Sequence, residues 1–236
     1  MLPILRIDNI ILCNIIKRIN RFVVRVNINN VETLAHLANT GRLSDYLVNG
    51  KIGFCIPIKA SKLRYRIIAI EDQEYAALID TKLHEVAFIE SIKRNFIPWL
   101  PNCFIYGRNI NVDDSIIDFG LLCNGSKIFI ELKSAVLRIQ NIYASYPDCP
   151  SKRGRKQLES LSKIAKYVKS YVVFIAALPN IKGFKPSCDI DPDLCSAMKI
   201  AYRNNVVFKS INIFFDPKNN NIVLADNDLP IDFNFN

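Results

Sequence analysis

The sequence predicts a two-domain α+β protein in which a small β-barrel precedes a mixed sheet flanked by helices. Residues 4–70 alternate short β-branched segments with breaks rich in Asn and Gly, the pattern of a barrel of about five strands. Beyond residue 80, helical and strand patterns alternate. Residues 1–70 also hold 11 Lys and Arg against 3 Asp and Glu, which is +8 of the net charge of +9. We therefore divide the chain into domains 1–80 and 81–236.

Five segments of the first domain are predicted to form the barrel, with a short helix near 43–47. The strands are expected at 12–17, 21–28, 32–37, 51–58 and 63–70. This spacing predicts a barrel of the OB type, a fold that binds nucleic acids or sugars on one sheet face. Because side chains alternate along a strand, Arg21 and Arg25 share a face that can lie against phosphates. We predict that these two residues, with Arg42 from a following loop, contact DNA.

Helical and strand patterns alternate throughout the second domain. Helices are expected at 81–95, 151–169 and 191–202, and strands at 104–106, 116–122, 128–139, 171–178, 206–214 and 221–224. Ser151 is placed to cap the second helix and Asp191-Pro192 to open the third, because these residue types suit the start of a helix. Hairpins followed by a β-α-β-α-β order predict a mixed sheet with helices on its faces.

The dipeptide Asn124-Gly125 between two apolar runs predicts a tight hairpin in this domain. A two-residue turn needs positive φ at both positions, which Asn and Gly tolerate. The ladder would then pair 122 with 127, 120 with 129 and 118 with 131. Asp118 would face Glu131 about 5 Å away at Cβ, with Lys133 on the same side. Two carboxylates so placed repel each other unless a cation lies between them.

Asp118, Glu131 and Lys133 form a pattern that is typical of metal-dependent nucleases. In such sites the carboxylates hold one or two Mg²⁺ ions, and the Lys polarises the attacking water or the phosphate. We predict Asp118 and Glu131 as ligands of Mg²⁺ or Mn²⁺, Lys133 as the third catalytic residue, and Glu90 or Asp148 as assisting acids. The alternative is an exposed sheet face on which Lys133 only neutralises Glu131.

Positive charge gathers at the start of the predicted helix 151–169. Arg153, Arg155 and Lys156 lie in its first turns, where the helix dipole favours acids. Because stability alone would not place cations there, we predict that these three residues bind backbone phosphate. With the basic barrel, they indicate a DNA partner that is double-stranded and read with little sequence preference. The alternative is a solvated basic face.

The cysteines, histidines and apolar runs predict a cytoplasmic protein without a zinc site. The seven cysteines form no CxxC pattern and neither histidine is near a cysteine in sequence, so we expect free thiols in a reducing compartment. No apolar run approaches the roughly 18 residues of a membrane span. Residues 1–6 show no signal-peptide pattern. We therefore expect no membrane segment.

Several short segments, each weak by itself, occur in one order along almost the whole chain. They are Arg21-Phe22, Asn39-Thr40-Gly41-Arg42-Leu43, Asn49-Gly50, Asp118-Phe119, Glu131-Leu132-Lys133-Ser134, Tyr146-Pro147-Asp148, Arg153-Gly154, and Phe184 with Pro186. This ordered set resembles the sugar fermentation stimulation protein A family. The resemblance implies an N-terminal OB-fold domain, a C-terminal nuclease-like domain of the PD-(D/E)xK type, DNA binding and a role in regulating sugar (maltose) metabolism. Position 116, where the family pattern has Arg, is Ile here and removes a cation opposite Lys133.

Three functions therefore remain open at this point. The first is a DNA-binding protein with a metal site that hydrolyses phosphodiesters. The second is a non-catalytic DNA-binding regulator that retains the nuclease fold. The third is an OB module that binds RNA or sugar beside a structural domain.

Overall fold

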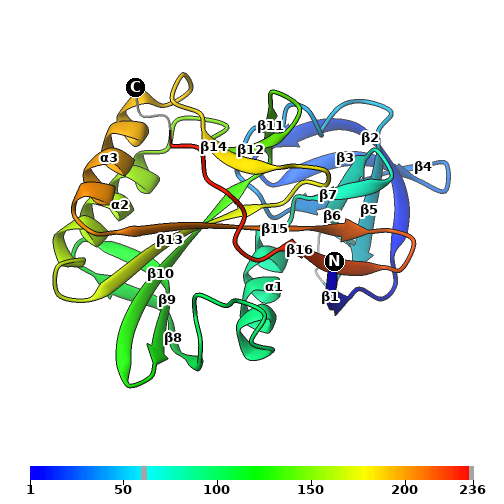
Figure 1. Cartoon of the computed structure of the whole chain (residues 1–236). Coiled ribbons are helices and arrows are strands. Elements are labelled where there is room, and N and C mark those ends of the chain that lie inside the picture. The colour runs from blue at the N-terminus through cyan, green and yellow to red at the C-terminus, as the bar shows by residue number, and fades with distance from the viewer. Residues whose placement is uncertain (60–62, 234–236) are drawn as a thin grey trace.

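Five strands close the N-terminal barrel that the sequence predicts (Figure 1). The computed structural model describes residues 1–59 and 63–233. The barrel strands are β2 (Ile11–Asn20), β3 (Val23–Ile28), β4 (Val31–Leu37), β5 (Ile52–Pro57) and β6 (Tyr65–Asp72). β2 pairs with β3 and β5, β3 with β4, and β5 with β6, all antiparallel, while a short parallel pairing of β4 with β6 closes the ring. This is the OB arrangement.

Alternation along β3 separates the barrel interior from its outer face. Val24 and Val26 are fully buried inside the barrel, whereas Arg25 between them is only half-buried on the outside. The short helix predicted near 43–47 is wrong, because the structure has turns there. Leu43 has a φ of +52°, which breaks a right-handed helix, and its buried side chain anchors the loop.

A mixed sheet forms the second domain, as predicted. The strands β8 (Cys103–Val112), β9 (Ser115–Cys123) and β10 (Ser126–Ala135) run antiparallel, and β13 (Lys169–Ala176) and β15 (Val207–Asp216) continue the sheet in parallel. β13 is buried over nearly its whole length, as a central parallel strand requires. A second sheet of three short strands, β11 (Leu137–Ile139), β12 (Tyr143–Tyr146) and β14 (Gly183–Pro186), lies beside it.

Three helices flank the main sheet close to where the sequence placed them. They are α1 (Thr81–Lys93), α2 (Lys152–Ile164) and α3 (Pro192–Arg203). The side chains of Asp80, Ser151 and Asp191 cap their first turns by accepting backbone N–H groups. α2 ends at Ile164, five residues before the predicted end. Figure 1 shows α2 and α3 together at one end of the sheet, with α1 towards the barrel.

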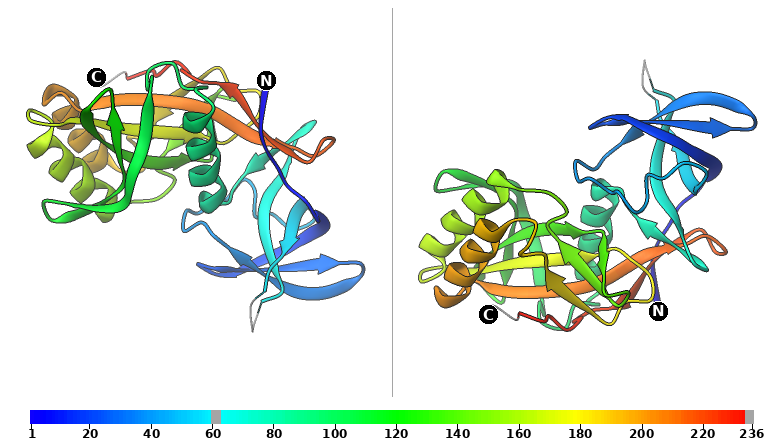
Figure 2. Two further views of the ribbon diagram at one scale, coloured as in Figure 1. Left: turned by 90° about the horizontal axis from the view of Figure 1, so that it is seen from below. Right: turned by 90° about the horizontal axis from the view of Figure 1, so that it is seen from above.

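Two strands join the barrel to the second domain in a way that the sequence did not reveal. β1 (Leu2–Arg6) pairs antiparallel with β16 (Asn221–Asp226), which itself pairs with β15. β7 (Tyr75–Leu78) pairs with β6 of the barrel and touches β15 through one residue pair. The barrel therefore lies beside the main sheet (Figure 2). The strand that precedes the barrel strands in sequence, β1, and the strand that follows them, β7, both connect the barrel to that sheet.

Four of the seven cysteines form disulfides, which corrects the expectation of free thiols throughout. Cys103 is bonded to Cys123, and Cys188 is bonded to Cys195. Cys103 and Cys123 face each other directly across β8 and β9, where antiparallel pairing brings Cβ atoms within disulfide range. The pairing was hidden because the two residues are 20 positions apart in sequence. The free cysteines are Cys13, Cys55 and Cys149.

Candidate functional site

The predicted hairpin has the expected register, but its two strands separate at the predicted site. Backbone pairing of β9 with β10 runs from Cys123–Ser126 to Phe119–Ile130 and ends there. At the next position Asp118 Oδ2 accepts the backbone N–H of Leu132 at 2.8 Å, and Glu131 Oε2 accepts that of Asp118 at 3.3 Å. Each carboxylate thus takes a hydrogen bond from the opposite strand in place of the ladder.

Lys133 is held between an acid and an amide. Its Nζ donates to Glu131 Oε1 at 2.7 Å and to Gln157 Oε1 at 2.6 Å. The Nε2 of Gln157 in turn donates to the carbonyl of Ile116 at 2.9 Å. The sequence placed Ile116 directly opposite Lys133, but the strands have separated and Gln157 of α2 lies between them. Gln157 fixes the lysine and was not predicted as a site residue.

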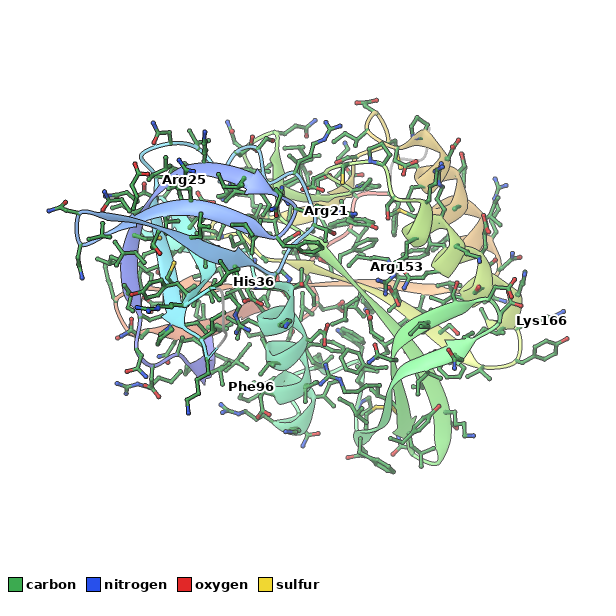
Figure 3. All side chains as sticks on the ribbon, turned by 180° about the vertical axis from the view of Figure 1, so that it is seen from behind. Arg21, Arg25, His36, Phe96, Arg153 and Lys166 are labelled. Atoms are coloured by element: carbon green, nitrogen blue, oxygen red, sulfur yellow. A yellow bond between two sulfur atoms is a disulfide. The ribbon has the colours of Figure 1, made fainter. Side chains whose placement is uncertain are left out.

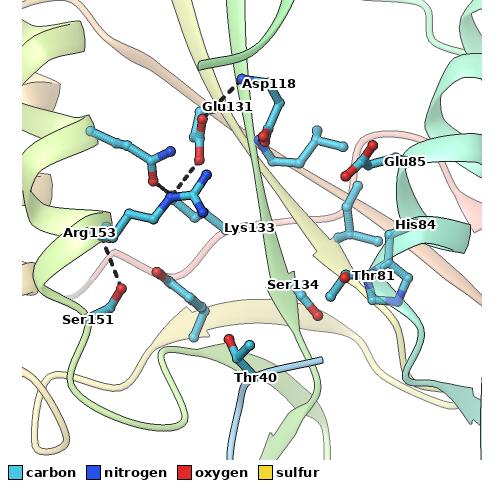
Figure 4. Close-up of a pocket in the computed structure, with 15 residues that line it drawn as sticks. Thr40, Thr81, His84, Glu85, Asp118, Glu131, Lys133, Ser134, Ser151 and Arg153 are labelled. Carbon is cyan, nitrogen blue, oxygen red and sulfur yellow. Dashed lines mark hydrogen bonds and ion pairs between the residues drawn. The ribbon is translucent and has the colours of Figure 1, made fainter. Parts of the chain in front are cut away.

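A cavity of about 250 Å³ opens beside the separated strands (Figure 4). Asp118, Glu131 and Lys133 line one side of it, and the exposed Arg153 of α2 stands at its mouth. Glu85 of α1 lines the same cavity. The carboxylate of Glu85 forms an ion pair with Arg108 of β8 and is partly exposed. Other residues that line it are Thr40, Thr81, His84 and Ser134.

Burial raises the pKa values of the three carboxyl groups, and the charge of Asp118 adds to the shift of the other two. Burial, with a contribution from Asp118 and opposed by Lys133, raises the pKa of Glu131 to about 7. Burial also raises the pKa of Asp118, and burial together with the charge of Asp118 raises that of Glu85. Burial opposes the charge of Lys133, but Glu131 and other neighbours outweigh it and raise its pKa. The lysine therefore stays protonated at neutral pH.

The donor atoms at this site suit a hard divalent cation. Mg²⁺ is commonly held by one or two carboxylates, with water and phosphate oxygens as its other ligands. Asp118 and Glu131 provide that number of carboxylates, and their raised pKa values show that added positive charge would stabilise both. Within residues 1–59 and 63–233, no three His, Cys, Asp or Glu side chains converge as a complete ligand set. The pair therefore fits Mg²⁺ or Mn²⁺ with outer ligands from solvent or substrate.

The two acids predicted to assist lie elsewhere. Glu90 forms an ion pair with Lys93 and does not line the cavity, because five residues along a helix turn it away from the face of Glu85. Asp148 accepts the backbone N–H of Leu43 at 3.1 Å and holds a barrel loop. The acid of α1 that faces the carboxylates is Glu85, and helical periodicity from the buried Leu83 and Ala87 could not distinguish it from Glu90.

The predicted phosphate-binding residues divide into exposed and internally paired groups. Arg21, Arg42, Arg153 and Lys156 are exposed. Arg155 instead forms ion pairs with Asp193 and, at 3.5 Å, with Asp191, so its charge ties α2 to α3. Arg25 lies 3.9 Å from Glu32 on the outer barrel face. Figure 3 places Arg25 on the part of the barrel remote from Arg153, whereas Arg21 lies on the side towards it.

Both halves of the chain match known protein families. Residues 82–219 match the domain described as sugar fermentation stimulation protein RE domain, and residues 16–79 match the SfsA N-terminal OB domain. The chain belongs to the sugar fermentation stimulation protein family. The homolog of this family from Pyrococcus furiosus is 39% identical over 205 residues, covering 86% of this chain and 89% of the homolog. The homolog from Archaeoglobus fulgidus is 38% identical over 230 residues, covering 98% and 99%.

A solved structure of the family shares the whole architecture. It is described as the structure of Pyrococcus furiosus SfsA in complex with Ca²⁺. It superposes with a TM-score of 0.95 at 34% sequence identity, covering 99% of this chain and 100% of the solved chain. The family fold thus includes both the OB barrel and the mixed sheet of the second domain. In the described part of the chain, no helix is both long and apolar enough to cross a membrane.

Proposed function

We propose that the protein binds DNA and hydrolyses phosphodiester bonds at Asp118, Glu131 and Lys133 with Mg²⁺ or Mn²⁺. The observation that carries the proposal is the separation of β9 from β10, which leaves two carboxylates and a protonated lysine on one cavity wall. Two acids and a fixed cation beside a cavity of about 250 Å³ are an arrangement that suits metal-assisted phosphodiester hydrolysis.

Each residue of the wall has a separate role in this proposal. Asp118 and Glu131 would hold the metal, which when bound supplies a Lewis acid and an activated water. The Nζ of Lys133, held by Glu131 and Gln157, stabilises negative charge that develops on the phosphate. Arg153 at the mouth binds the adjacent backbone phosphate, since it is exposed and forms no ion pair within the described residues.

DNA would dock through exposed cations on both domains. Arg21, Arg25 and Arg42 of the barrel and Lys156 of α2 would contact phosphates of a duplex. Such contacts carry no sequence information, so binding with little sequence preference follows. Arg155 contributes less than predicted because Asp191 and Asp193 pair with it. A cytoplasmic location and the regulation of sugar (maltose) metabolism belong to the same proposal.

One observation favours a second candidate, a non-catalytic DNA-binding regulator. Glu131 already accepts a hydrogen bond from Lys133 at 2.7 Å, and both carboxylates accept hydrogen bonds from backbone N–H groups. Donors within the protein therefore already stabilise part of the negative charge of the two carboxylates. Ile116 also supplies no cation to this edge. A protein with a site of this kind would keep its fold and bind DNA without hydrolysing it.

Nicking of supercoiled plasmid in the presence of Mg²⁺ or Mn²⁺ separates the two candidates. Negative supercoiling exposes locally melted stretches of the plasmid, so we expect nicking that EDTA stops and that Asp118→Asn abolishes. Asp8→Asn, at an exposed position, serves as the matched control and should nick at the wild-type rate. DNA that stays intact on prolonged incubation, while binding with a steep salt dependence in wild type and Glu131→Gln alike, would establish the regulator instead.

A further inference from the structure

A second cavity runs between the barrel and the second domain and joins the carboxylate cavity. Its volume is about 700 Å³, and its walls come from the barrel loop 38–43 and from the segment 146–155. We call it the interdomain groove. Thr40, Thr81, Ser134 and Arg153 line both the groove and the carboxylate cavity. A ligand that binds in the groove can therefore extend as far as Asp118 and Glu131.

Cations from both domains that form no ion pair with any described residue lie along this groove. Arg21 of the barrel and Lys152 and Arg153 of α2 line it, and all three are exposed. Figure 3 shows Arg21 and Arg153 in the central part of the molecule, whereas Lys166 lies at its far margin. The phosphate backbone of a polyanion can bind along such a row of cations, which here ends at the carboxylate site.

The dimensions of the site exclude a duplex from its inner end. Glu131 and Lys133 are only 3% and 6% exposed, so these two reacting groups lie at the bottom of a recess, while Asp118 is partly exposed. Across the groove, the backbone N–H of Leu43 donates to Asp148, which holds its two walls together. A cavity of this size encloses a drug-sized molecule, or about two nucleotides. A single strand can enter such a groove, whereas a stiff double helix cannot.

Two buried polar atoms in this recess have no hydrogen-bond partner within residues 1–59 and 63–233. They are Nδ1 of His84, a side chain only 2% exposed, and Oγ of Ser134. The Nε2 of His84 lies 2.7 Å from the carbonyl of Leu78 and must carry the hydrogen, so Nδ1 is an acceptor. A buried acceptor without a donor is costly, which indicates a ligand that supplies a hydrogen-bond donor. In a DNA strand the bases have such groups, whereas the phosphodiesters have none.

We propose that the interdomain groove binds a single DNA strand and that the recess of Thr40, Thr81, His84 and Ser134 receives one of its bases. The strand's phosphates lie against Arg21, Lys152 and Arg153, and the base donates a hydrogen bond to His84. The substrate is therefore DNA that is unpaired at the site of reaction, such as a frayed end or a branch. The inference rests on the proposed function and narrows its substrate.

Cys149 offers a native probe of the groove. It is partly exposed and lines the groove, whereas Cys13 and Cys55 are buried and the other four cysteines are in disulfides. A maleimide should therefore modify the folded protein at Cys149, and Cys149→Ser should remain unmodified. We expect a saturating single-stranded 20-mer to slow modification at least about fivefold, and a blunt duplex of the same sequence, also saturating, to leave it unchanged.

The outcomes of this protection experiment are distinguishable. Protection by the single strand alone supports the groove proposal. Equal protection by both DNAs, or none by a bound single strand, overturns it and leaves DNA binding itself intact. If neither DNA binds in a gel-shift assay at low salt, the proposed function fails and the groove proposal fails with it.

Ser134→Ala tests the recess without disturbing the fold. Because Ser134 Oγ has no hydrogen-bond partner among the described residues, its removal should not lower thermal stability. We expect single-strand affinity to fall about fivefold, the value of one hydrogen bond, and duplex affinity to stay constant. Ser44→Ala, at an exposed barrel position, is the control. Unchanged single-strand affinity in Ser134→Ala would exclude the base from this recess.

Substitutions of the groove cations test the path. Arg21→Ala and Lys152→Ala should each weaken single-strand binding more than duplex binding, by about fivefold or more at low salt. Arg203→Ala and Lys166→Ala are matched controls, since both residues are exposed and neither lines the groove. Equal losses in the groove variants and the controls would show that only overall charge matters.

Discussion

The Nζ atom of Lys133 lies 2.7 Å from Oε1 of Glu131, and both side chains are buried. Removing the cation from such a pair leaves an acid in a poorly solvated site, which typically costs about 3 kcal/mol or more. The free energy of unfolding therefore depends on the protonation state of Glu131 and on the charge of Lys133. Its consequences can be measured without any DNA.

We expect Lys133→Met to destabilise the metal-free protein more at pH 8 than at pH 6. The folded pKa of Glu131 is about 7 against an ordinary 4.5, so ionisation of this group costs stability as pH rises between those values. Lys133 lowers this pKa, and without it the loss continues to higher pH. Urea unfolding in EDTA at both pH values measures the difference. The double variant Lys133→Met, Glu131→Gln should show no such difference between the two pH values. If Lys133→Met lowers the free energy of unfolding equally at pH 6 and pH 8, the stability effect of Lys133 does not depend on the ionisation of Glu131.

His84 should make the protein sensitive to acid. Burial lowers its pKa to about 4 from the ordinary 6.5, although its hydrogen bond to Leu78 opposes the shift. Below pH 6.5 the unfolded chain therefore binds a proton at this histidine that the folded protein does not bind. The free energy of unfolding accordingly falls from pH 6.5 towards pH 4. By pH 4.5 the loss is about 2 kcal/mol. His84→Gln should flatten this part of the stability curve, whereas the partly exposed His36→Gln should change it less.

Arg153 and Arg155 should have separable effects although they are two positions apart. Arg153→Ala should weaken DNA binding and reduce the slope of affinity against salt by about one, because it removes a phosphate contact. Arg155→Ala should instead lower the free energy of unfolding by about 1 kcal/mol, since its ion pairs join α2 to α3. Salt titrations of binding and urea unfolding of both variants test this. Unchanged affinity in Arg153→Ala at low salt would remove that residue from the interface.

Asp148 should hold the barrel loop and take no part in the reaction. It accepts the N–H of Leu43, and a Cβ at Gly41 would collide with its carboxylate. Asp148→Ala should cost about 1 kcal/mol and speed hydrogen exchange at the Leu43 amide. The exposed Asp8→Ala should change stability by less than about 0.5 kcal/mol. A complete loss of nicking in Asp148→Ala, with the loop still protected, would restore Asp148 as an assisting acid.

The fold was predictable because period-two and helical patterns are local properties of the chain. The hairpin register followed from Asn124-Gly125, and two helix starts followed from Ser151 and Asp191. Features that depend on distant pairing were missed. Examples are β1, which joins a strand more than 200 residues away, and the Cys103–Cys123 disulfide. No local pattern reports such partners.

The sequence brought Asp118, Glu131 and Lys133 together but did not reveal the geometry around them. The sequence placed Asp118 beside Glu131 correctly, yet it treated the hairpin as a continuous ladder. In the structure the strands part at this point, and Gln157 enters from α2. A polar residue on the inward face of an amphipathic helix was the available signal for Gln157. Glu85 could not be separated from Glu90 because its position depends on how α1 packs.

The pairing of β1 with β16 affects the order in which the molecule can assemble. During synthesis the barrel strands leave the ribosome long before Asn221–Asp226, so the barrel can fold early. β1 cannot pair with β16 until Asn221–Asp226 has been made. A large loop must therefore close late, and this high contact order slows the final step. A nascent chain would present its basic barrel to nucleic acid before the carboxylates of the second domain are in place.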